Sequence, residues 1–388
     1  MNSDHTEPFI AIACGGTGGH LFPGLAVAQQ LQARGCVVTL LISPKDVDQQ
    51  AVKSVSGMEI FALPAVGLQG QNYLSFTRSF LKSLYAARNI FRRRTPSAVL
   101  AMGGFTSAPP VFAAKLSGAK TFLHESNTVP GRANRLLARF VNSAFVGFPE
   151  TAARLRAKAV FVTGTPVRPQ FQMRDAAACR AALGLDASRS TILVVGGSQG
   201  ARGLNELVLS ALPLLKNRDW QWLHLTGPND FENVKSAYAA LGITAVVRPF
   251  LAEMGLGLGA ATAGISRAGA SSLAELAAMR LPSLLVPLPT AADNHQFFNA
   301  CAFDDSGAAK ILLQKSKPEK MAALLSELVT DEVARLKMRM ALAQWHVPDA
   351  AAQIADNILS GLGSEFVVSQ KNTGPVGVAG RMNLKVVS

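Results

Sequence analysis

Three glycine-rich segments, each directly after a short apolar run, are the residues of this sequence best suited to chemistry. They are Gly15-Gly16-Thr17-Gly18-Gly19-His20, Met102-Gly103-Gly104-Phe105-Thr106-Ser107 and Gly196-Gly197-Ser198-Gln199-Gly200-Ala201. Glycine at a strand-to-helix turn lets backbone N–H groups approach an oxyanion, and the helix N-terminus adds partial positive charge. A tight turn explains any single pair of glycines equally well. Three such turns at strand ends favour phosphate or diphosphate binding.

Two further segments in the second half carry polar groups that could bind a nucleotide or a sugar. Ser266-Arg267-Ala268-Gly269-Ala270 leads to Ser271 and Ser272, either of which could cap a helix whose first turns hold Glu275. The N–H groups of that helix start suit a diphosphate, and Glu275 could accept both hydroxyls of a ribose; an ordinary capping box is the alternative. Downstream, Asp293-Asn294-His295-Gln296 brings amide and imidazole groups that suit sugar hydroxyls.

Several other kinds of site are not indicated. There is no G-x-x-x-x-G-K-[ST] motif, and the first glycine loop is not G-x-G-x-x-G, so neither a P-loop ATPase nor a typical dinucleotide site is predicted. Asp46-Val47-Asp48 has a spacing that can hold a metal, but its polar surroundings favour a solvated loop. The four cysteines are scattered, without a C-x-x-C pair. We therefore expect no metal and no other cofactor.

The elements that position these loops follow a repeated pattern. An apolar strand over 8–14, a helix ending at Gly35 and an apolar strand over 37–42 form a βαβ unit, and a further strand over 98–101 precedes the second glycine loop. The pattern restarts with a strand over 191–195, a helix over 205–212 and a strand over 222–225. The sequence therefore predicts an α/β protein with two Rossmann-like, doubly wound parallel-sheet domains.

Domain boundaries follow from turn residues and from the loss of periodicity. We expect an N-terminal domain over 1–163, a joint at Thr163-Gly164-Thr165-Pro166, a C-terminal domain over 164–345 and a closing helix within 346–362. Residues 363–388 have no clear period and are predicted to be a flexible tail.

Length and charge limit the class of protein. The 388 residues are 49% hydrophobic and 16% charged, as in globular proteins, and the length suggests two domains. The net charge is +13, and residues 60–160 alone carry 14 basic and 2 acidic side chains, which points to a polyanionic partner. The first basic residue is Arg34, so no secretory signal is expected. The uncharged stretch 95–114 contains paired glycines and paired prolines, so it is not predicted to span a membrane.

Several segments together, in this order, resemble the bacterial UDP-N-acetylglucosamine (UDP-GlcNAc) transferases of glycosyltransferase family 28, which convert lipid I to lipid II in peptidoglycan synthesis. The resemblance covers residues 10–358. The segments are the first glycine loop with Phe22-Pro23-Gly24-Leu25-Ala26, then Leu123-His124-Glu125-Ser126-Asn127, Gly164-Thr165-Pro166-Val167-Arg168, the third glycine loop and Ser266-Arg267-Ala268-Gly269-Ala270. This sequence differs from the family pattern at three positions. Phe105 stands where relatives have tyrosine, Ala108 where they have glycine, and Thr165 where they have asparagine. Phe105 therefore lacks the hydroxyl with which that tyrosine could hydrogen-bond the acceptor.

The resemblance implies a GT-B fold, with two Rossmann-like domains facing a cleft, that binds UDP-GlcNAc mostly in the C-terminal half and lipid I in the N-terminal half. It implies inverting transfer of GlcNAc to the C4 hydroxyl of MurNAc, and with it a role in cell-wall biogenesis, cell shape and cell division. The donor-binding residues that it implies are Thr17, Gly18, Gly19, Asn127, Arg168, Ser198, Leu251, Ala270, Ser271, Ser272, Leu273, Ala274, Glu275, His295 and Gln296.

For this reaction a base must take the proton of the acceptor hydroxyl. His20, at the mouth of the first glycine loop, titrates near neutrality and is the candidate, with Glu125 as the rival base or as the residue that orients it. Without the resemblance, a helix-start histidine bonded to a neighbouring carbonyl would be the preferred interpretation of His20. Helix N-termini and Arg168, rather than a metal, would stabilise the departing UDP, and closure around 163–166 would exclude water. A transferase with another lipid acceptor, a UDP-GlcNAc epimerase and a non-catalytic UDP-sugar-binding protein are the alternatives.

The segment 73–94 mixes aromatic and cationic side chains, as helices do that lie on anionic lipid. A buried helix with a solvated basic face and a nucleic-acid patch are the alternatives, but the local charge favours a membrane surface. We expect a peripheral protein on the cytoplasmic face of the inner membrane, with no nucleic-acid partner. The residues of the expected membrane patch are Phe76, Arg78, Phe80, Lys82, Arg92, Arg93 and Arg94.

Overall fold

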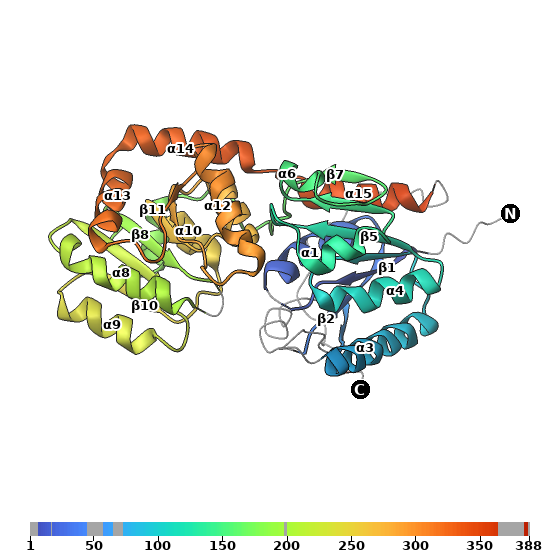
Figure 1. Cartoon of the computed structure of the whole chain (residues 1–388). Coiled ribbons are helices and arrows are strands. Elements are labelled where there is room, and N and C mark those ends of the chain that lie inside the picture. Colours follow the sequence, from blue (N-terminus) through green and yellow to red (C-terminus); the bar gives the residue numbers. More distant parts are fainter. Residues whose placement is uncertain are drawn as a thin grey trace. The chain divides into compact units, whose positions relative to one another are not determined.

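A computed structural model describes residues 7–16, 18–44, 57–64, 73–197, 200–363 and 384–386 of the chain. Its contacts divide the chain into two units, Met1–Arg168 with Pro348–Ser388 and Pro169–Val347, which are described separately below (Figure 1). The division falls five residues after the expected boundary at 163, and the segment that begins at Pro348 returns to the first unit.

The first unit is built on a parallel sheet, in which eight described strands have the order β14-β3-β2-β1-β4-β5-β6-β7. The strands are β1 (Phe9–Ala13), β2 (Val37–Ile42), β3 (Glu59–Ala62), β4 (Ala98–Ala101), β5 (Lys120–Glu125), β6 (Ser143–Val146), β7 (Val160–Val162) and β14 (Leu384–Val386). β1, β2 and β4 are apolar along nearly their whole length because helices cover both faces of the sheet.

The tail prediction is altered by β14, which pairs in parallel with β3 and places Leu384 beside Ile60. These three residues therefore form a strand rather than a flexible segment. The rest of the expected tail, 364–383 and 387–388, lies outside the described residues.

Helices cover both faces of this sheet with separate apolar cores (Figure 1). On one face, α1 (Gly18–Ala33) and α15 (Ala350–Leu362) bury side chains such as Leu25 and Ile354. On the other, α3 (Tyr73–Arg93) and α4 (Ala108–Leu116) bury Phe91 and Val111. The predicted closing helix is α15, and it belongs to the first unit.

Shorter elements complete this unit: η1 (Phe105–Ser107), α5 (Arg132–Leu137) and α6 (Pro149–Ala152). The end of α1 is tied to α15 by an ion pair between Arg34 Nε and Asp356 Oδ1, 2.7 Å apart. Gly35 follows α1 with a φ of +79°, so it ends the helix as the sequence predicts.

The second unit repeats the plan, with six parallel described strands in the order β10-β9-β8-β11-β12-β13. These are β8 (Ser190–Val195), β9 (Trp220–Leu225), β10 (Ala245–Arg248), β11 (Ala263–Ser266), β12 (Ser283–Leu285) and β13 (Lys310–Ile311). The helices are α7 (Ala176–Ala182), α8 (Arg202–Leu215), α9 (Phe231–Ala240), α10 (Met254–Ala260), α11 (Ala270–Ala278), η2 (Ala292–Asn294), α12 (His295–Asp305), α13 (Pro318–Thr330) and α14 (Glu332–Trp345). The predicted fold class is confirmed: both units are Rossmann-like parallel α/β layers.

Within the described part of the chain, no helix has both the length and the apolar character needed to cross a membrane.

Candidate functional site

The strand order of each sheet reverses at one place, and the glycine loops lie there. In the first unit the reversal is between β1 and β4, and in the second between β8 and β11. Ligands of open parallel α/β sheets bind at the carboxyl ends of the strands flanking this reversal. The first two glycine loops follow β1 and β4, and the third follows β8. The fold therefore brings all three to the edge of a sheet where binding is expected.

The start of α11 differs from the prediction. The N-cap is Gly269, without a side-chain cap, so the prediction that Ser271 or Ser272 caps this helix is wrong. Leu273 N donates the first intrahelical hydrogen bond to Gly269 O at 2.9 Å. Gly269 can cap because it has extended backbone and its carbonyl begins the helical pattern without help from a side chain.

As a result, both serines lie in the first turn of α11, with Ala270 before them and Ala274 and Glu275 after Leu273. The N–H groups of residues 270–272 precede the first intrahelical bond, at the positive end of the helix. This end of α11 follows β11 directly and so lies at the carboxyl edge of the second sheet.

Arg267, between β11 and α11, is a buried cation to which the sequence motifs assign no role. It is 6% exposed, and its Nη1 donates to the carbonyls of Val286 at 3.0 Å and Pro287 at 3.3 Å. Its Nη2 donates to Gln314 Oε1 at 2.7 Å, and burial lowers the pKa of its guanidinium. Among the described residues, the Arg267 guanidinium thus donates to neutral acceptors. Its positive charge therefore favours binding of an anion at this edge of the sheet. The sequence feature that could have identified Arg267 was its position directly after an apolar strand.

The turn before α12 is held by one of the predicted sugar-binding residues. Gln296 Oε1 accepts a hydrogen bond from Leu288 N at 3.0 Å, so its Nε2 remains to donate to a ligand. His295 Nδ1 lies 2.7 Å from Ala292 O, which requires the proton on Nδ1 and leaves Nε2 as an acceptor. Leu251, by contrast, follows β10 and its side chain is buried, so only its backbone is expected to contact the uracil.

Two predicted donor-binding residues, Thr17 and Ser198, lie outside the described residues, as does the Asp46-Val47-Asp48 segment. Their roles stay predictions. Among the described residues, no group of three or more histidine, cysteine or acidic side chains is arranged to hold a metal ion.

In the first unit, His20 brings the first two glycine loops together. It is the third residue of α1, just after Gly18 and Gly19, and its imidazole lies against the backbone of the second loop. A Cβ built on Gly103 would lie 2.8 Å from His20 Cε1, and Gly103 has a φ of +116°. Glycine at 103 is therefore required both by the backbone conformation and by the ring beside it.

Glu125, at the end of β5, is almost fully buried and accepts four hydrogen bonds. Its Oε1 takes Asn127 N and Asn127 Nδ2, both at 2.9 Å. Its Oε2 takes Gly131 N at 2.9 Å and Asn134 Nδ2 at 2.8 Å. A carboxylate with all its lone pairs engaged in this way is well suited to fixing a loop and poorly suited to accepting a substrate proton.

Asn134, in α5, is a second residue to which the sequence motifs assign no role. Its Nδ2 lies 3.2 Å from the Cβ position of Gly103, the same point that His20 approaches. Glu125 therefore holds the side chains of both Asn127 and Asn134, and Asn134 lies beside the His20 ring. The motif around Glu125 identified this carboxylate as a candidate, but it did not predict Asn134, nine positions further along the chain, as its hydrogen-bond partner.

His124 and Arg168 connect other parts of the first unit. His124 Nε2 lies 3.1 Å from Gly164 O, and burial lowers the pKa of His124 to about 4, so the ring is neutral at pH 7. The Arg168 guanidinium lies 4.0 Å from the centre of the Phe22 ring on α1. The cation–π contact places Arg168 next to the first glycine loop, where an anion is expected.

Helix α3 is half buried, with its cations in solvent. Phe76 and Phe80 are half-buried and form a chain of aromatic contacts with Phe105, Phe112 and Phe140. The apolar groups that reach solvent are instead Leu74, Leu81 and Tyr85, with exposed fractions of 86%, 56% and 64%. The predicted cations Arg78, Lys82, Arg92, Arg93 and Arg94 are exposed. The exposed face thus carries apolar groups among cations, although not the two phenylalanines that we expected there.

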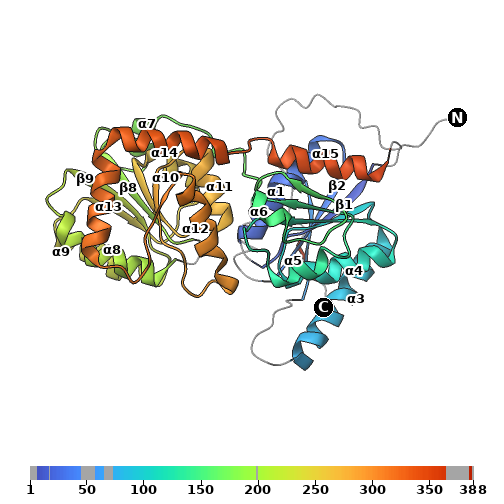
Figure 2. The same ribbon diagram turned by 45° about the horizontal axis from the view of Figure 1, so that its top comes forward.

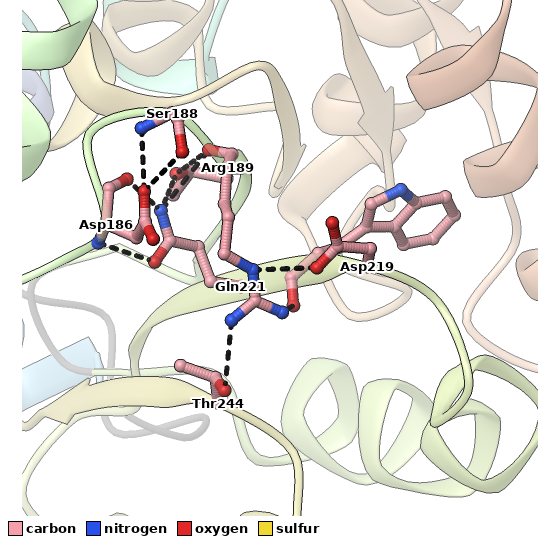
Figure 3. A network of polar contacts seen from close by, with 8 residues as sticks. Asp186, Ser188, Arg189, Asp219, Gln221 and Thr244 are labelled. Carbon is pink, nitrogen blue, oxygen red and sulfur yellow. Dashed lines mark hydrogen bonds and ion pairs between the residues drawn. The ribbon is translucent and has the colours of Figure 1, made fainter.

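Figure 3 shows a dense polar network in the second unit that is not part of the candidate site. Asp186 Oδ1 accepts hydrogen bonds from Ser188 Oγ at 2.6 Å and from Ser188 N at 2.8 Å, and these two bonds lower the pKa of Asp186. Gln221 Nε2 donates to Asp186 O at 2.6 Å, and Arg189 Nε pairs with Asp219 Oδ1 at 2.9 Å. These residues lie at the amino ends of β8 and β9, opposite the edge that holds the glycine loops, so their role is structural.

Comparisons with known proteins agree with this arrangement. Residues 10–146 match the glycosyltransferase family 28 N-terminal domain, and residues 191–354 match the family 28 C-terminal domain. A Xanthomonas euvesicatoria pv. vesicatoria protein is 38% identical over 92% of this chain and 81% of its own length. A Listeria monocytogenes serovar 1/2a protein is 33% identical over 90% of this chain and 99% of its own length. Both are named UDP-N-acetylglucosamine–N-acetylmuramyl-(pentapeptide) pyrophosphoryl-undecaprenol N-acetylglucosamine transferase.

Among solved structures, Acinetobacter baumannii MurG is similar, with a TM-score of 0.73 and 30% identity over 92% of this chain and 100% of its own. A UDP-N-acetylglucosamine 2-epimerase from Listeria monocytogenes, described as putative, has a TM-score of 0.66 at 16% identity, over 92% and 97% of the two chains. At that identity the second likeness concerns the fold alone.

Proposed function

The chain belongs to glycosyltransferase family 28, and we propose that it transfers GlcNAc from UDP-GlcNAc to the N-acetylmuramyl sugar of the undecaprenyl-diphosphate acceptor, lipid I. The observation that carries this proposal is the identity of 33–38%, over about nine-tenths of the chain, to proteins named for that activity. The product is lipid II, the precursor of peptidoglycan.

The second unit binds the donor in this proposal. The start of α11 and the third glycine loop, with Ser198, bind the diphosphate. The buried positive charge of Arg267, between β11 and α11, attracts the diphosphate as well. Glu275 accepts the ribose hydroxyls, and the backbone at Leu251 contacts the uracil. His295 Nε2 and Gln296 Nε2 are the atoms left to bind sugar hydroxyls after their internal hydrogen bonds are made.

The first unit supplies the base and binds the acceptor. His20 takes the proton from the C4 hydroxyl of MurNAc as that oxygen forms a bond to C1 of GlcNAc. The bond between C1 and the diphosphate oxygen breaks on the opposite face, and UDP leaves with the electron pair, so the α donor gives a β product. Helix N-termini and Arg168 stabilise the charge that develops on UDP.

Glu125 acts as a positioning residue in this scheme rather than as the base. Its four internal hydrogen bonds fix Asn127, which contacts the donor sugar, and Asn134, which lies beside His20. The contact between Gly103 and the imidazole then limits the positions that His20 can take.

The acceptor is anchored in a bilayer, so the enzyme works at a membrane surface. The exposed face of α3 binds anionic lipid, with Leu74, Leu81 and Tyr85 at the interface and the surrounding arginines and Lys82 facing the headgroups. The protein is accordingly peripheral, on the cytoplasmic face of the inner membrane, where it contributes to cell-wall growth.

The test is transfer of radiolabelled GlcNAc from UDP-GlcNAc to a short-chain lipid I analogue, with disaccharide lipid, free sugar and UDP-sugar epimer separated chromatographically. The proposal expects label in the disaccharide lipid with a β linkage. Label only in the 2-epimer would identify an epimerase, and tight UDP-GlcNAc binding without any product would identify a binding protein.

A further inference from the structure

A cavity of about 210 Å³ lies on the second unit between α7 and α14, away from the glycine loops. Its walls come from α7, from the residues that precede β11 and from α14, and Figure 2 shows both helices at the surface. Thr262, one of the lining residues, donates from its backbone to Thr191 O at the start of β8, so the cavity is at the amino ends of these strands. The lining residues are Ala176, Arg180, Ala261, Thr262, Glu332, Arg335, Leu336 and Arg339.

Three of these side chains are arginines, and Glu332 is the one carboxylate among the lining residues. Arg180 is held rigidly: Nε donates to Ala260 O at 2.9 Å, and Nη2 donates to Thr262 Oγ1 at 3.1 Å. Its remaining bond, from Nη1 to Ala187 O at 3.0 Å, is also to a neutral acceptor. Because a guanidinium has five N–H groups, Arg180 keeps donors for a ligand.

Arg335 is fixed in a similar way, since its Nη1 donates to the carbonyls of Leu328 and Val329 at the end of α13. Arg339 follows Arg335 by one turn of α14 and lines the same cavity. Two of the cations thus donate hydrogen bonds to neutral groups, and a third lies beside them. The lining carries three guanidinium groups against the one carboxylate of Glu332, while Asp175 and Asp186 attract Arg180 from outside the lining. A group with several anionic oxygens, such as a phosphate, complements it.

Exposed apolar side chains lie on the same helix, next to the arginines. Val333, Leu336 and Met340 of α14 are 63%, 57% and 65% exposed, whereas Met338 and Leu342 are the residues that the helix buries. Leu336 also lines the cavity, and Lys337 is exposed between the apolar groups. Cations interleaved with exposed apolar groups match a lipid surface, which offers both anionic and apolar partners, better than they match a free anion or an acidic peptide.

We propose that this surface, formed by α14 and the arginine-lined cavity, is a second docking site for anionic phospholipid. The phosphate of one headgroup enters the cavity between Arg180, Arg335 and Arg339, and Leu336 and Met340 contact the apolar part of the bilayer interface. The site belongs to the second unit, so it is distinct from the α3 surface, and its test does not depend on transferase activity.

The test uses the full chain with an environment-sensitive fluorophore on α14. Cys14, Cys36 and Cys179 are buried, so a C301S/M340C variant directs a thiol-reactive nitrobenzoxadiazole label to position 340. The label is titrated with vesicles of phosphatidylcholine alone and with vesicles of equal parts phosphatidylcholine and phosphatidylglycerol. The proposal expects a blue shift with the phosphatidylglycerol vesicles only, and no shift for the same label placed by L214C on α8, where Leu214 is also exposed.

Substitutions then test the arginine cavity. R339Q/L336S changes two exposed residues, leaves the bonds of Arg180 and Arg335 intact, and is checked for an unchanged melting temperature. We expect the lipid concentration at half-maximal shift to rise at least fivefold from the lost charge alone. The matched control L214S/K216Q, which removes one exposed leucine from α8 and the exposed cation that directly follows this helix, leaves that lipid concentration unchanged.

An unshifted label at position 340, whether or not the protein sediments with the vesicles, overturns the proposal. So does an equal loss of binding in R339Q/L336S and in the α8 control, because the attraction would then follow net charge rather than this surface.

Discussion

Replacing Glu125 with glutamine separates its two conceivable roles, because they predict different effects on stability. The carboxylate accepts from two donors at each oxygen. A glutamine can keep its carbonyl toward Asn127, but its NH2 group then faces Gly131 N–H and Asn134 Nδ2, which are donors too. Asn134 Nδ2, a buried donor, then loses its acceptor at a cost of about 1–3 kcal/mol, and the N–H of Gly131, an exposed residue, loses a hydrogen bond worth about 1 kcal/mol.

The expected loss of unfolding free energy is therefore about 3 kcal/mol. In a unit of this size, 1 kcal/mol corresponds to about 2–4 °C in melting temperature, so Glu125→Gln should lower the transition of the first unit by about 6–12 °C. Transfer should fall as well, because Asn127 and Asn134 are no longer held. Cooling should restore part of it, and the acidic limb of the kcat/KM profile should stay in place if His20 is the base.

The assay is differential scanning calorimetry together with transfer to a soluble acceptor analogue at several temperatures, with Glu150→Gln, an exposed residue of α6, as the control. The reasoning is refuted if Glu125→Gln melts within about 2 °C of the wild type and still loses about a thousandfold in kcat. That result would make Glu125 the base.

Three further outcomes are expected. Burial lowers the pKa of His124 to about 4, whereas the unfolded chain takes up the proton near 6.5, so the folded first unit should lose stability as pH falls from about 6.5 to about 4, by up to about 3 kcal/mol. Urea titrations of the wild type and of His124→Gln across this range check it, and an equal slope in both would contradict the assignment. Arg267→Gln should weaken UDP binding at least tenfold by calorimetry, with Arg218→Gln, an exposed residue before β9 at the amino ends of the strands, as the unaffected control. Leu81→Ser with Tyr85→Ser should reduce sedimentation with anionic vesicles while leaving kcat on a soluble acceptor unchanged, and Leu313→Ser, exposed in the second unit, should change neither.

Elements buried on both faces were the parts of the fold most accessible from sequence. β2 and β4 have the predicted bounds because a central parallel strand is apolar at nearly every position, so its ends coincide with the ends of the apolar run. The return of α15 to the first unit was not predictable in this way. Its contact with α1 joins Arg34 to Asp356, 322 positions apart, and no local pattern reports such a pairing.

The candidate site was predictable where glycines mark it and not where distant side chains complete it. Gly103 was identified as a loop residue, but its role as the platform for His20 depends on two loops meeting at the edge of the sheet. Arg267 is held by Gln314, 47 positions away, and Asn134 is held by Glu125 across a turn whose path the motif does not give. The start of α11 was misplaced because serine is the commoner cap, whereas here the extended backbone of Gly269 begins the helix.

The most direct test of the account is transfer by His20→Ala, measured beside UDP-GlcNAc affinity. We predict that kcat for GlcNAc transfer to the lipid I analogue falls about 10²–10⁴-fold, that the affinity for UDP-GlcNAc stays within about twofold, and that the acidic limb of the pH profile disappears. Transfer within tenfold of the wild type, with that limb intact, would contradict the assignment of His20 as the base.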